Sequence, residues 1–135
     1  MRVLDKGAHL TLGARPGHAL ATMRGQSEHF WFAISYRSMA YEIVLAPEAV
    51  EDLRALKANL RAAVRTALET HLRHEPRKTS RSRVKRLRGL RRPQFRLRVG
   101  EARVFYDISG STVEILAIVT KSEAEAWLEQ FGDPG

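Results

Sequence analysis

Three arginines, Arg96, Arg98 and Arg103, stand close together in the sequence and can bind or stabilise negative charge. A guanidinium group stays protonated at physiological pH, and its rigid fork of N–H donors matches the oxygens of a phosphate. Such a group can hold a phosphate or stabilise charge that develops in a transition state, but it is a poor general base. The three residues therefore predict an anion-binding site, where any proton transfer needs another side chain.

A tight hairpin is expected to bring these arginines onto one surface. Segments 95–99 and 102–108 both have the composition of strands, and Gly100-Glu101 between them favours a type II′ turn. That turn fixes the register of the two strands, and side chains then alternate between the two faces. The apolar face, which we expect to be core, consists of Phe95, Leu97, Val99, Val104 and Tyr106.

In this register Arg98 lies directly opposite Arg103, and Phe105 lies opposite the remaining arginine. Like charges across a strand pair cost up to about 1 kcal/mol, so a compensating group is expected. Three interpretations remain open: an anionic partner, neutralisation by Asp107 or Glu114 of the same chain, or an ordinary solvated surface. Phe105 would add an aromatic surface on which a base could stack.

A proton-transferring group is harder to find. Lys121 is a candidate acid/base or phosphate-binding residue, whereas Tyr106 should face the core. Histidine titrates near neutral pH, but His71 and His74 precede a proline at the end of an expected helix. Histidines in such places are more often surface or capping residues than catalytic ones.

The charge distribution also points to a phosphate-rich partner. Residues 77–103 contain twelve Lys or Arg and one acid, whereas the whole chain carries a net charge of +8, so the remainder is acidic on balance. A basic block in such a chain is typical of nucleic-acid binding, although a solvated charged face is the alternative. The candidate RNA-binding residues are Lys85, Arg86, Arg88, Arg91, Arg92 and Phe105.

The elements that position these residues begin after residue 38. Segment 41–45 reads as a strand, and Pro47 opens a helix whose apolar stripe is formed by Ala49, Leu53, Leu56 and Leu60. Asn59 is the expected break before a second amphipathic helix that ends near His74 and Pro76. Together they predict a helical hairpin packed on a sheet.

The second half of the chain supplies most of that sheet. Strands are expected at 84–87, 95–99, 102–108 and 112–119, followed by a helix over 121–131. In the last strand Val113, Ile115, Ala117 and Val119 should share one face and Leu116 and Ile118 the other, which is typical of a central strand. The order predicts a small α+β domain with a largely antiparallel sheet and a C-terminal helix.

Composition restricts the remaining possibilities. The 135 residues suffice for one domain, over residues 39–135, and residues 1–38 are expected to be a poorly ordered extension, either a misplaced start or a dispensable arm. No cysteine is present, and His9, His18 and His29 lack the spacing of metal ligands, so neither metal nor cofactor is expected. No segment is long enough to span a membrane, and the absence of cysteine is the usage expected in a reducing cytoplasm, so the chain is expected there.

Three blocks of the chain resemble the RelE/ParE toxin superfamily of bacterial type II toxin-antitoxin modules. They are Tyr41 to Leu53 (YEIVLAPEAVEDL), Val84 to Gly89 (VKRLRG) and Phe95 to Tyr106 (FRLRVGEARVFY). The resemblance covers residues 41 to about 131 and implies the small microbial-RNase-like fold of RelE. It also implies a cognate antitoxin that wraps the toxin and neutralises its basic face.

The resemblance implies two different activities, one for each branch of the superfamily. RelE toxins cleave messenger RNA on the ribosome by attack of a 2′-hydroxyl on the adjacent phosphate; Arg96, Arg98 and Arg103 match their basic residues, and Lys121 replaces an arginine after the last strand. The tyrosine that follows in RelE is missing, and Trp127 cannot exchange a proton. ParE toxins share the fold without these residues and inhibit DNA gyrase. The expected function is a ribosome-dependent endoribonuclease, with a gyrase inhibitor or a degenerate toxin that only binds antitoxin as alternatives.

Overall fold

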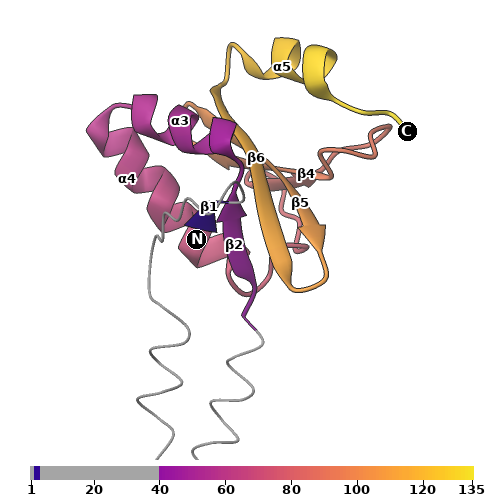
Figure 1. The fold of residues 1–135 in the computed structure, drawn as a ribbon, viewed down its shortest axis with the longest axis horizontal. Coiled ribbons are helices and arrows are strands. Elements are labelled where there is room, and N and C mark those ends of the chain that lie inside the picture. Colours follow the sequence, from indigo (N-terminus) through magenta and orange to yellow (C-terminus); the bar gives the residue numbers. More distant parts are fainter. Residues whose placement is uncertain (1, 4–39) are drawn as a thin grey trace, which may run out of the picture.

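A computed structural model describes residues 2–3 and 40–135 of the chain (Figure 1). The described part is a six-stranded sheet in the order β1-β2-β6-β5-β4-β3, with helices against it. Residues 1–38 were predicted to be poorly ordered, and most of them lie outside the described residues. The exception is Arg2–Val3, which form strand β1 and pair in parallel with β2. No periodicity in the sequence had indicated that short strand.

The sheet has the expected strands with one addition. β2 (Glu42–Leu45) runs parallel to β6 (Thr112–Thr120), and the other neighbours are antiparallel: β3 (Val84–Arg86), β4 (Phe95–Val99) and β5 (Ala102–Ser109). β6 lies between β2 and β5, which confirms that the last strand is central. The α+β fold with a mainly antiparallel sheet is therefore as predicted.

The helical hairpin exists, but its break comes earlier than Asn59. Helix α3 spans Pro47–Ala55 and helix α4 spans Ala58–Ala67, so Asn59 belongs to α4. The chain turns at Leu56, whose backbone is extended, and Arg61 donates hydrogen bonds to the carbonyl oxygens of Arg54 and Leu56 at 3.1 and 3.3 Å. These bonds satisfy carbonyl groups that the end of α3 leaves open.

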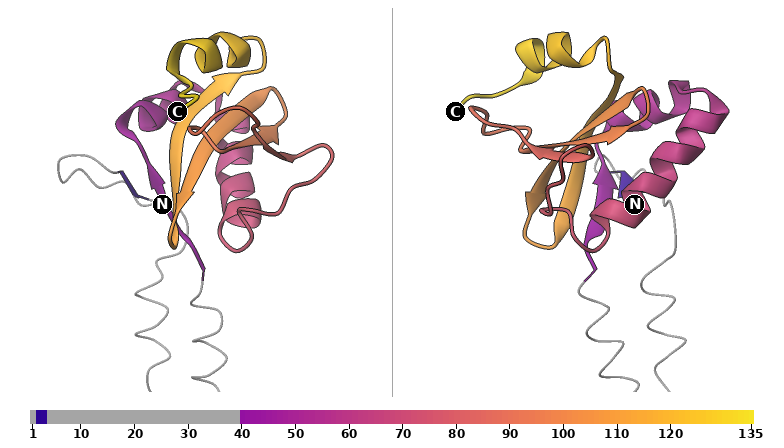
Figure 2. Two further views of the ribbon diagram at one scale, coloured as in Figure 1. Left: turned by 90° about the vertical axis from the view of Figure 1, so that its right-hand side faces the viewer. Right: turned by 180° about the vertical axis from the view of Figure 1, so that it is seen from behind.

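The core lies between the sheet and the hairpin. After α4 the chain continues as one π-helical turn, η1 (Leu68–Leu72), and the elements α3, α4 and η1 pack along the same side of the sheet (Figures 1 and 2). The fully buried side chains include Ile43, Leu45, Val64, Leu68, Leu72, Leu97, Val104, Tyr106 and Ile115. Tyr106 stacks on Phe95 with ring centres 5.3 Å apart.

β6 changes face within its length, which the alternation pattern missed. The register of β5 and β6 shifts between Phe105 and Tyr106, where Phe105 pairs with Ala117 and Tyr106 with Ile115. One extra residue in a strand reverses which face the following side chains occupy. Ile118 therefore joins Ile115 in the core. The prediction that Ala117 shares the face of Ile115 is wrong, because Ala117 pairs with Phe105 on the opposite face.

The C-terminal helix α5 (Ala124–Phe131) lies on the opposite side of the sheet from α3 and α4. It begins three residues later than expected, because Lys121 to Glu123 form a turn. Figure 1 shows α5 standing beyond the end of β6, away from the helical hairpin. None of its residues is fully buried, and Phe131 is 58% exposed, so this helix is joined to the domain through few side chains.

Candidate nucleic-acid interface

Three arginines lie on the face of β4 and β5 that points away from the helical hairpin. The pairing of β4 with β5 is the one predicted, with Arg98 opposite Arg103 and Arg96 opposite Phe105. Gly100 has φ +55° at the turn, a left-handed conformation that glycine adopts without a steric cost. We call Arg96, Arg98 and Arg103 the arginine row.

Among the described residues, two members of the arginine row are cations without a protein partner. Arg98 is exposed, and it makes no side-chain hydrogen bond or ion pair within residues 2–3 and 40–135. Arg96 is half-buried, and its Nε atom is buried with no hydrogen-bond partner in that part of the chain. Burial lowers the pKa of Arg96, and the charges of Arg103 and Arg98 lower it further. A buried N–H donor without an acceptor costs free energy, so this arginine favours the binding of an anion.

Arg103 differs from the other two, which corrects the expectation that all three are exposed. Its side chain is 6% exposed, and its Nη1 atom donates to the carbonyl oxygens of Gly100 and Ala102 at 2.7 and 2.9 Å. Burial, followed by the charge of Arg98, lowers the pKa of Arg103. Arg103 therefore holds the turn of the hairpin and contributes positive charge from beneath the surface.

Phe105 is not an open stacking surface, so its prediction as an RNA-binding residue is wrong. The side chain is fully buried, because the indole of Trp127 from α5 covers it with ring centres 4.9 Å apart and planes inclined by 8°. Phe131 lies against the indole of Trp127 at 5.4 Å. The apolar stripe of α5 indicated that this helix packs, but nothing in the sequence indicated that its tryptophan would cover Phe105, which lies opposite Arg96.

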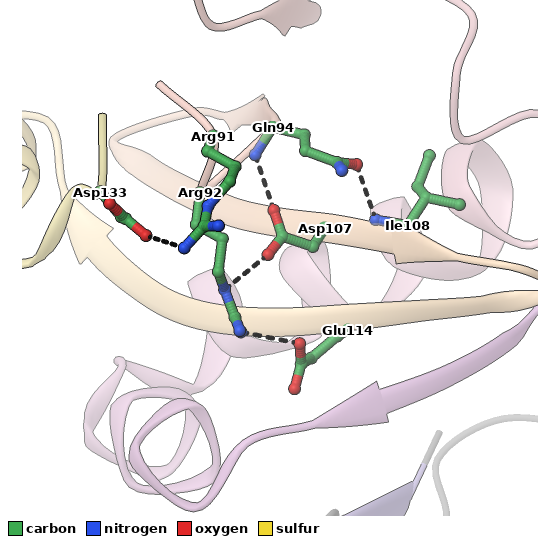
Figure 3. A network of polar contacts seen from close by, with 7 residues as sticks. All are labelled: Arg91, Arg92, Gln94, Asp107, Ile108, Glu114 and Asp133. Atoms are coloured by element: carbon green, nitrogen blue, oxygen red, sulfur yellow. Dashed lines mark hydrogen bonds and ion pairs between the residues drawn. The ribbon is translucent and has the colours of Figure 1, made fainter. Parts of the chain in front are cut away.

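Arg91 and Arg92, both predicted to bind RNA, are paired with carboxylates of their own chain (Figure 3). Arg92 pairs with Asp107 at 2.8 Å and with Glu114 at 2.9 Å, and Arg91 pairs with Asp133 at 2.6 Å. Asp107 and Glu114 were the acids expected to neutralise the arginine row. Their pairing with Arg92 instead holds the loop before β4 against the sheet, and the pair of Arg91 with Asp133 holds it against the C-terminal segment.

The network around Arg92 is partly buried. Asp107 also accepts the N–H of Gln94 at 2.7 Å, and the amide of Gln94 in turn accepts the N–H of Ile108 at 3.0 Å (Figure 3). Burial raises the pKa of Asp107, against the opposing effects of the Gln94 hydrogen bond and of Arg92. Because Asp107 and Glu114 are occupied in this way, internal neutralisation of Arg96 and Arg98 by these acids is excluded.

The remaining candidate RNA-binding residues lie on the edge strand β3 and in the turn that follows it. Lys85 is exposed and pairs in register with Arg96 across β3 and β4. Arg86 is exposed and lies over the ring of Phe95 at 5.1 Å, and Arg88 is exposed in the following turn. Lys85 therefore shares the face of the arginine row, whereas Arg86 lies on the opposite face of the sheet, beside Phe95.

No neutral-pH acid or base sits within the arginine row itself. Tyr106 is buried on the other face and donates to the carbonyl oxygen of Pro76 at 2.8 Å, and burial raises its pKa. Lys121 is exposed, and its backbone N–H bonds the carbonyl oxygen of Glu101 at 2.7 Å, which places it beside the hairpin turn. The site can bind phosphate and stabilise negative charge, and Lys121 lies beside its hairpin turn.

Other kinds of site are poorly supported in the described part of the chain. Within residues 2–3 and 40–135 no group of three or more His, Cys, Asp or Glu side chains could hold a metal ion. In the same segments no helix is both long and apolar enough to cross a bilayer.

A solved toxin has the same fold, and two solved toxin-antitoxin complexes align more weakly. A variant of the toxin RelE of E. coli in the free state aligns with a TM-score of 0.53 and 19% identity, over 68% of this chain and 98% of that one. The RelBE2 toxin-antitoxin complex of Mycobacterium tuberculosis aligns with a TM-score of 0.48 and 29% identity, over 60% of this chain and 98% of that one. A RelB-RelE complex of Methanococcus jannaschii aligns with a TM-score of 0.49 and 17% identity, over 62% and 95%.

Sequence comparison gives the family. A search of curated proteins found no match. Residues 43–125, well over half of the chain, match the family described as the ParE toxin of the type II toxin-antitoxin system parDE. The chain therefore belongs to the ParE toxin family, within the RelE/ParE superfamily, and is a toxin of a type II toxin-antitoxin system.

Proposed function

We propose that this toxin is a ribosome-dependent endoribonuclease that cleaves messenger RNA, with Arg96 and Arg98 as its phosphate-binding residues. The observation that carries the proposal is the unpartnered Nε of Arg96 beside the unpaired guanidinium of Arg98. Two such cations on one face leave charge that a polyanion can neutralise. Residues 39–135 carry this activity, and its place is the cytoplasm, where ribosomes translate messenger RNA.

In the proposed reaction, the main role of the arginines is to stabilise negative charge in the transition state. A ribose 2′-hydroxyl attacks the adjacent phosphorus, the bond from phosphorus to the 5′-oxygen breaks, and a 2′,3′-cyclic phosphate and a 5′-hydroxyl end result. The proton of the 2′-hydroxyl leaves with a base and a proton reaches the 5′-oxygen. Guanidinium groups aimed at the phosphoryl oxygens stabilise the charge that builds up in the transition state.

Lys121 is the proposed acid/base or phosphate contact at the turn end of the row. Arg103 contributes its charge from below, while Lys85, Arg86 and Arg88 bind more distant phosphates of the message or of ribosomal RNA. A cognate antitoxin is the second expected partner, and acidic side chains on it would neutralise the same surface.

A gyrase inhibitor is the competing function, and two observations favour it. The family that matches residues 43–125 is that of ParE toxins. In addition, Tyr106 is buried and bonded to Pro76, so the described part of the chain offers no tyrosine as acid or base at the arginine row. In this case the arginine row would bind acidic protein surface instead of RNA.

Primer extension on ribosomes programmed with a defined message separates the two functions. The proposal predicts discrete cuts in the codon of the A site within minutes of adding purified protein. A parallel reaction with supercoiled DNA and gyrase should show no accumulation of cleaved DNA. Gyrase-cleaved DNA without RNA cuts would establish the inhibitor instead, and neither product would indicate a toxin that retains only antitoxin binding.

A further inference from the structure

A pocket of about 220 Å³ lies outside the arginine row, where η1 meets the loop that leads to β3. Its walls carry six side chains that can donate a hydrogen bond: Thr70, His71, Lys78, Thr79, Ser80 and Arg83. Only one acid, Glu75, lines it. A concave surface so rich in donors is suited to a ligand rich in acceptors.

Hydrogen bonds inside the loop leave the Ser80 hydroxyl proton available to a ligand. Its Oγ accepts the backbone N–H groups of Arg83 and Val84, both at 3.1 Å, and the N–H of Ser80 donates to the carbonyl oxygen of Val84 at 2.9 Å. A hydroxyl oxygen has two acceptor positions and one proton. With both acceptor positions used, Ser80 can only donate, so its ligand must be an acceptor.

The charge of the pocket has the sign that an anion requires. Arg83 is exposed, and its guanidinium makes no hydrogen bond or ion pair in the part of the chain that the structure describes. Lys78 lies 3.9 Å from Glu75, but both side chains are mostly exposed, so this pair is weak. Burial lowers the pKa of His71, and the charge of Arg83, which lines the same pocket, lowers it further.

The pocket is connected to the arginine row through the edge of the sheet. The N–H of Arg98 donates to the carbonyl oxygen of Arg83 at 2.8 Å, so these two residues are neighbours across β3 and β4. Two residues further along, Lys85 pairs in register with Arg96. Arg83 and Lys85 thus continue the basic surface from the row, around the edge strand, to the pocket.

We propose that this pocket binds a backbone phosphate of the RNA strand whose scissile region lies on the arginine row. Arg83 and Lys78 supply the charge, and Ser80 and the neighbouring hydroxyl groups supply hydrogen bonds. The proposal rests on the proposed function only in taking RNA as the ligand. It assigns to the loop of residues 77–83 a binding role of its own, apart from the chemistry.

The salt dependence of RNA binding tests the pocket. For single-stranded nucleic acid, each phosphate contact contributes about 0.7 to the slope of log Kobs against log salt concentration. We expect Arg83→Gln and Lys78→Gln each to weaken binding of a single-stranded RNA several-fold and Arg83→Gln to reduce the slope by about 0.7. Arg65→Gln, which removes an exposed arginine of α4 that does not line the pocket, should change neither quantity.

A second measurement reports on the pocket directly. Inorganic phosphate, and separately the same RNA, should shift the imidazole NMR signals of His71 in the wild type and not in Arg83→Gln. An unchanged salt slope in Arg83→Gln, or His71 signals that respond to neither probe, would overturn the proposal. Neither readout involves cleavage. A protein that shows both expected results but cuts no RNA on ribosomes would contradict the proposed function and still support phosphate binding in the pocket.

Discussion

Arg98 and Arg103 face each other across β4 and β5, yet in the described part of the chain only the guanidinium of Arg103 is hydrogen-bonded. Arg103 donates to two carbonyl oxygens of the hairpin turn, while Arg98 projects into solvent without a partner in the described segments. Arg103 therefore has a structural role, whereas Arg98 is available to a ligand. This division predicts opposite outcomes when each residue is replaced.

Arg103→Gln should destabilise the protein by about 1–3 kcal/mol, because it removes buried hydrogen bonds to the carbonyl oxygens of Gly100 and Ala102. Arg98→Gln should change the free energy of unfolding by less than about 0.5 kcal/mol, since the side chain is exposed and its loss relieves a like-charge pair. Urea denaturation of both variants provides the comparison. Equal destabilisation by the two substitutions would contradict the assignment.

Trp127→Ala should loosen α5 from the sheet. Trp127 covers the buried ring of Phe105, and α5 has no fully buried residue of its own, so this stack is its main apolar anchor. We expect a loss of about 1–2 kcal/mol, and faster amide hydrogen exchange in residues 124–131 than in β5. Trp127→Phe keeps an aromatic ring over Phe105 and serves as the control. If exchange in α5 stays unchanged in Trp127→Ala, other contacts hold the helix.

Asp52→Asn should stabilise the protein at neutral pH. Asp52 of α3 accepts the N–H of Ile118 in β6 at 3.0 Å, and burial, with the charges of Glu123, Glu48 and Glu51, raises its pKa above 3.8. The folded state then binds the proton more tightly than the unfolded state, so this group costs stability as pH rises through the window just above 3.8. Asparagine keeps an acceptor for Ile118 without the charge.

The expected gain is a few tenths of a kcal/mol at pH 7, since the group is only half-buried, and it should vanish below pH 3.8. Asp52→Ala removes the acceptor as well and should destabilise the protein by about 1 kcal/mol, both at pH 7 and below pH 3.8. Thermal unfolding of the three proteins from pH 3 to 7 measures the difference. A gain in Asp52→Asn that is independent of pH would contradict the electrostatic explanation.

The sequence was sufficient to predict the hairpin and most of the fold because those features depend on local patterns. Gly100-Glu101 fixed the pairing of Arg98 with Arg103, and the apolar periodicities located the strands and helices. The bulge in β6 was not predictable, since Leu116 has nothing in its local sequence that marks an extra residue. The short strand Arg2–Val3 likewise depends on a distant partner, β2.

For the candidate site, the sequence predicted the face on which each side chain lies, because that face follows from the strand register, but not the partners of these side chains. Arg96 and Arg98 lie on the predicted face without a protein partner in the described segments. The sequence could not show that Trp127 would reach Phe105, or that Arg92 would take both Asp107 and Glu114, because these contacts join segments far apart in the chain. Long-range pairing between charges leaves no trace in local composition.

The most direct test of the arginine row compares A-site cleavage by two charge-matched variants. Arg98→Gln and Arg65→Gln each remove one exposed positive charge, the first from the row and the second from α4 on the other side of the sheet. In single-turnover reactions on programmed ribosomes, we expect Arg98→Gln to lose at least about 100-fold in cleavage rate, as for other transition-state donors, while Arg65→Gln stays within about twofold of the wild type. Equal rates for the two variants would contradict the account.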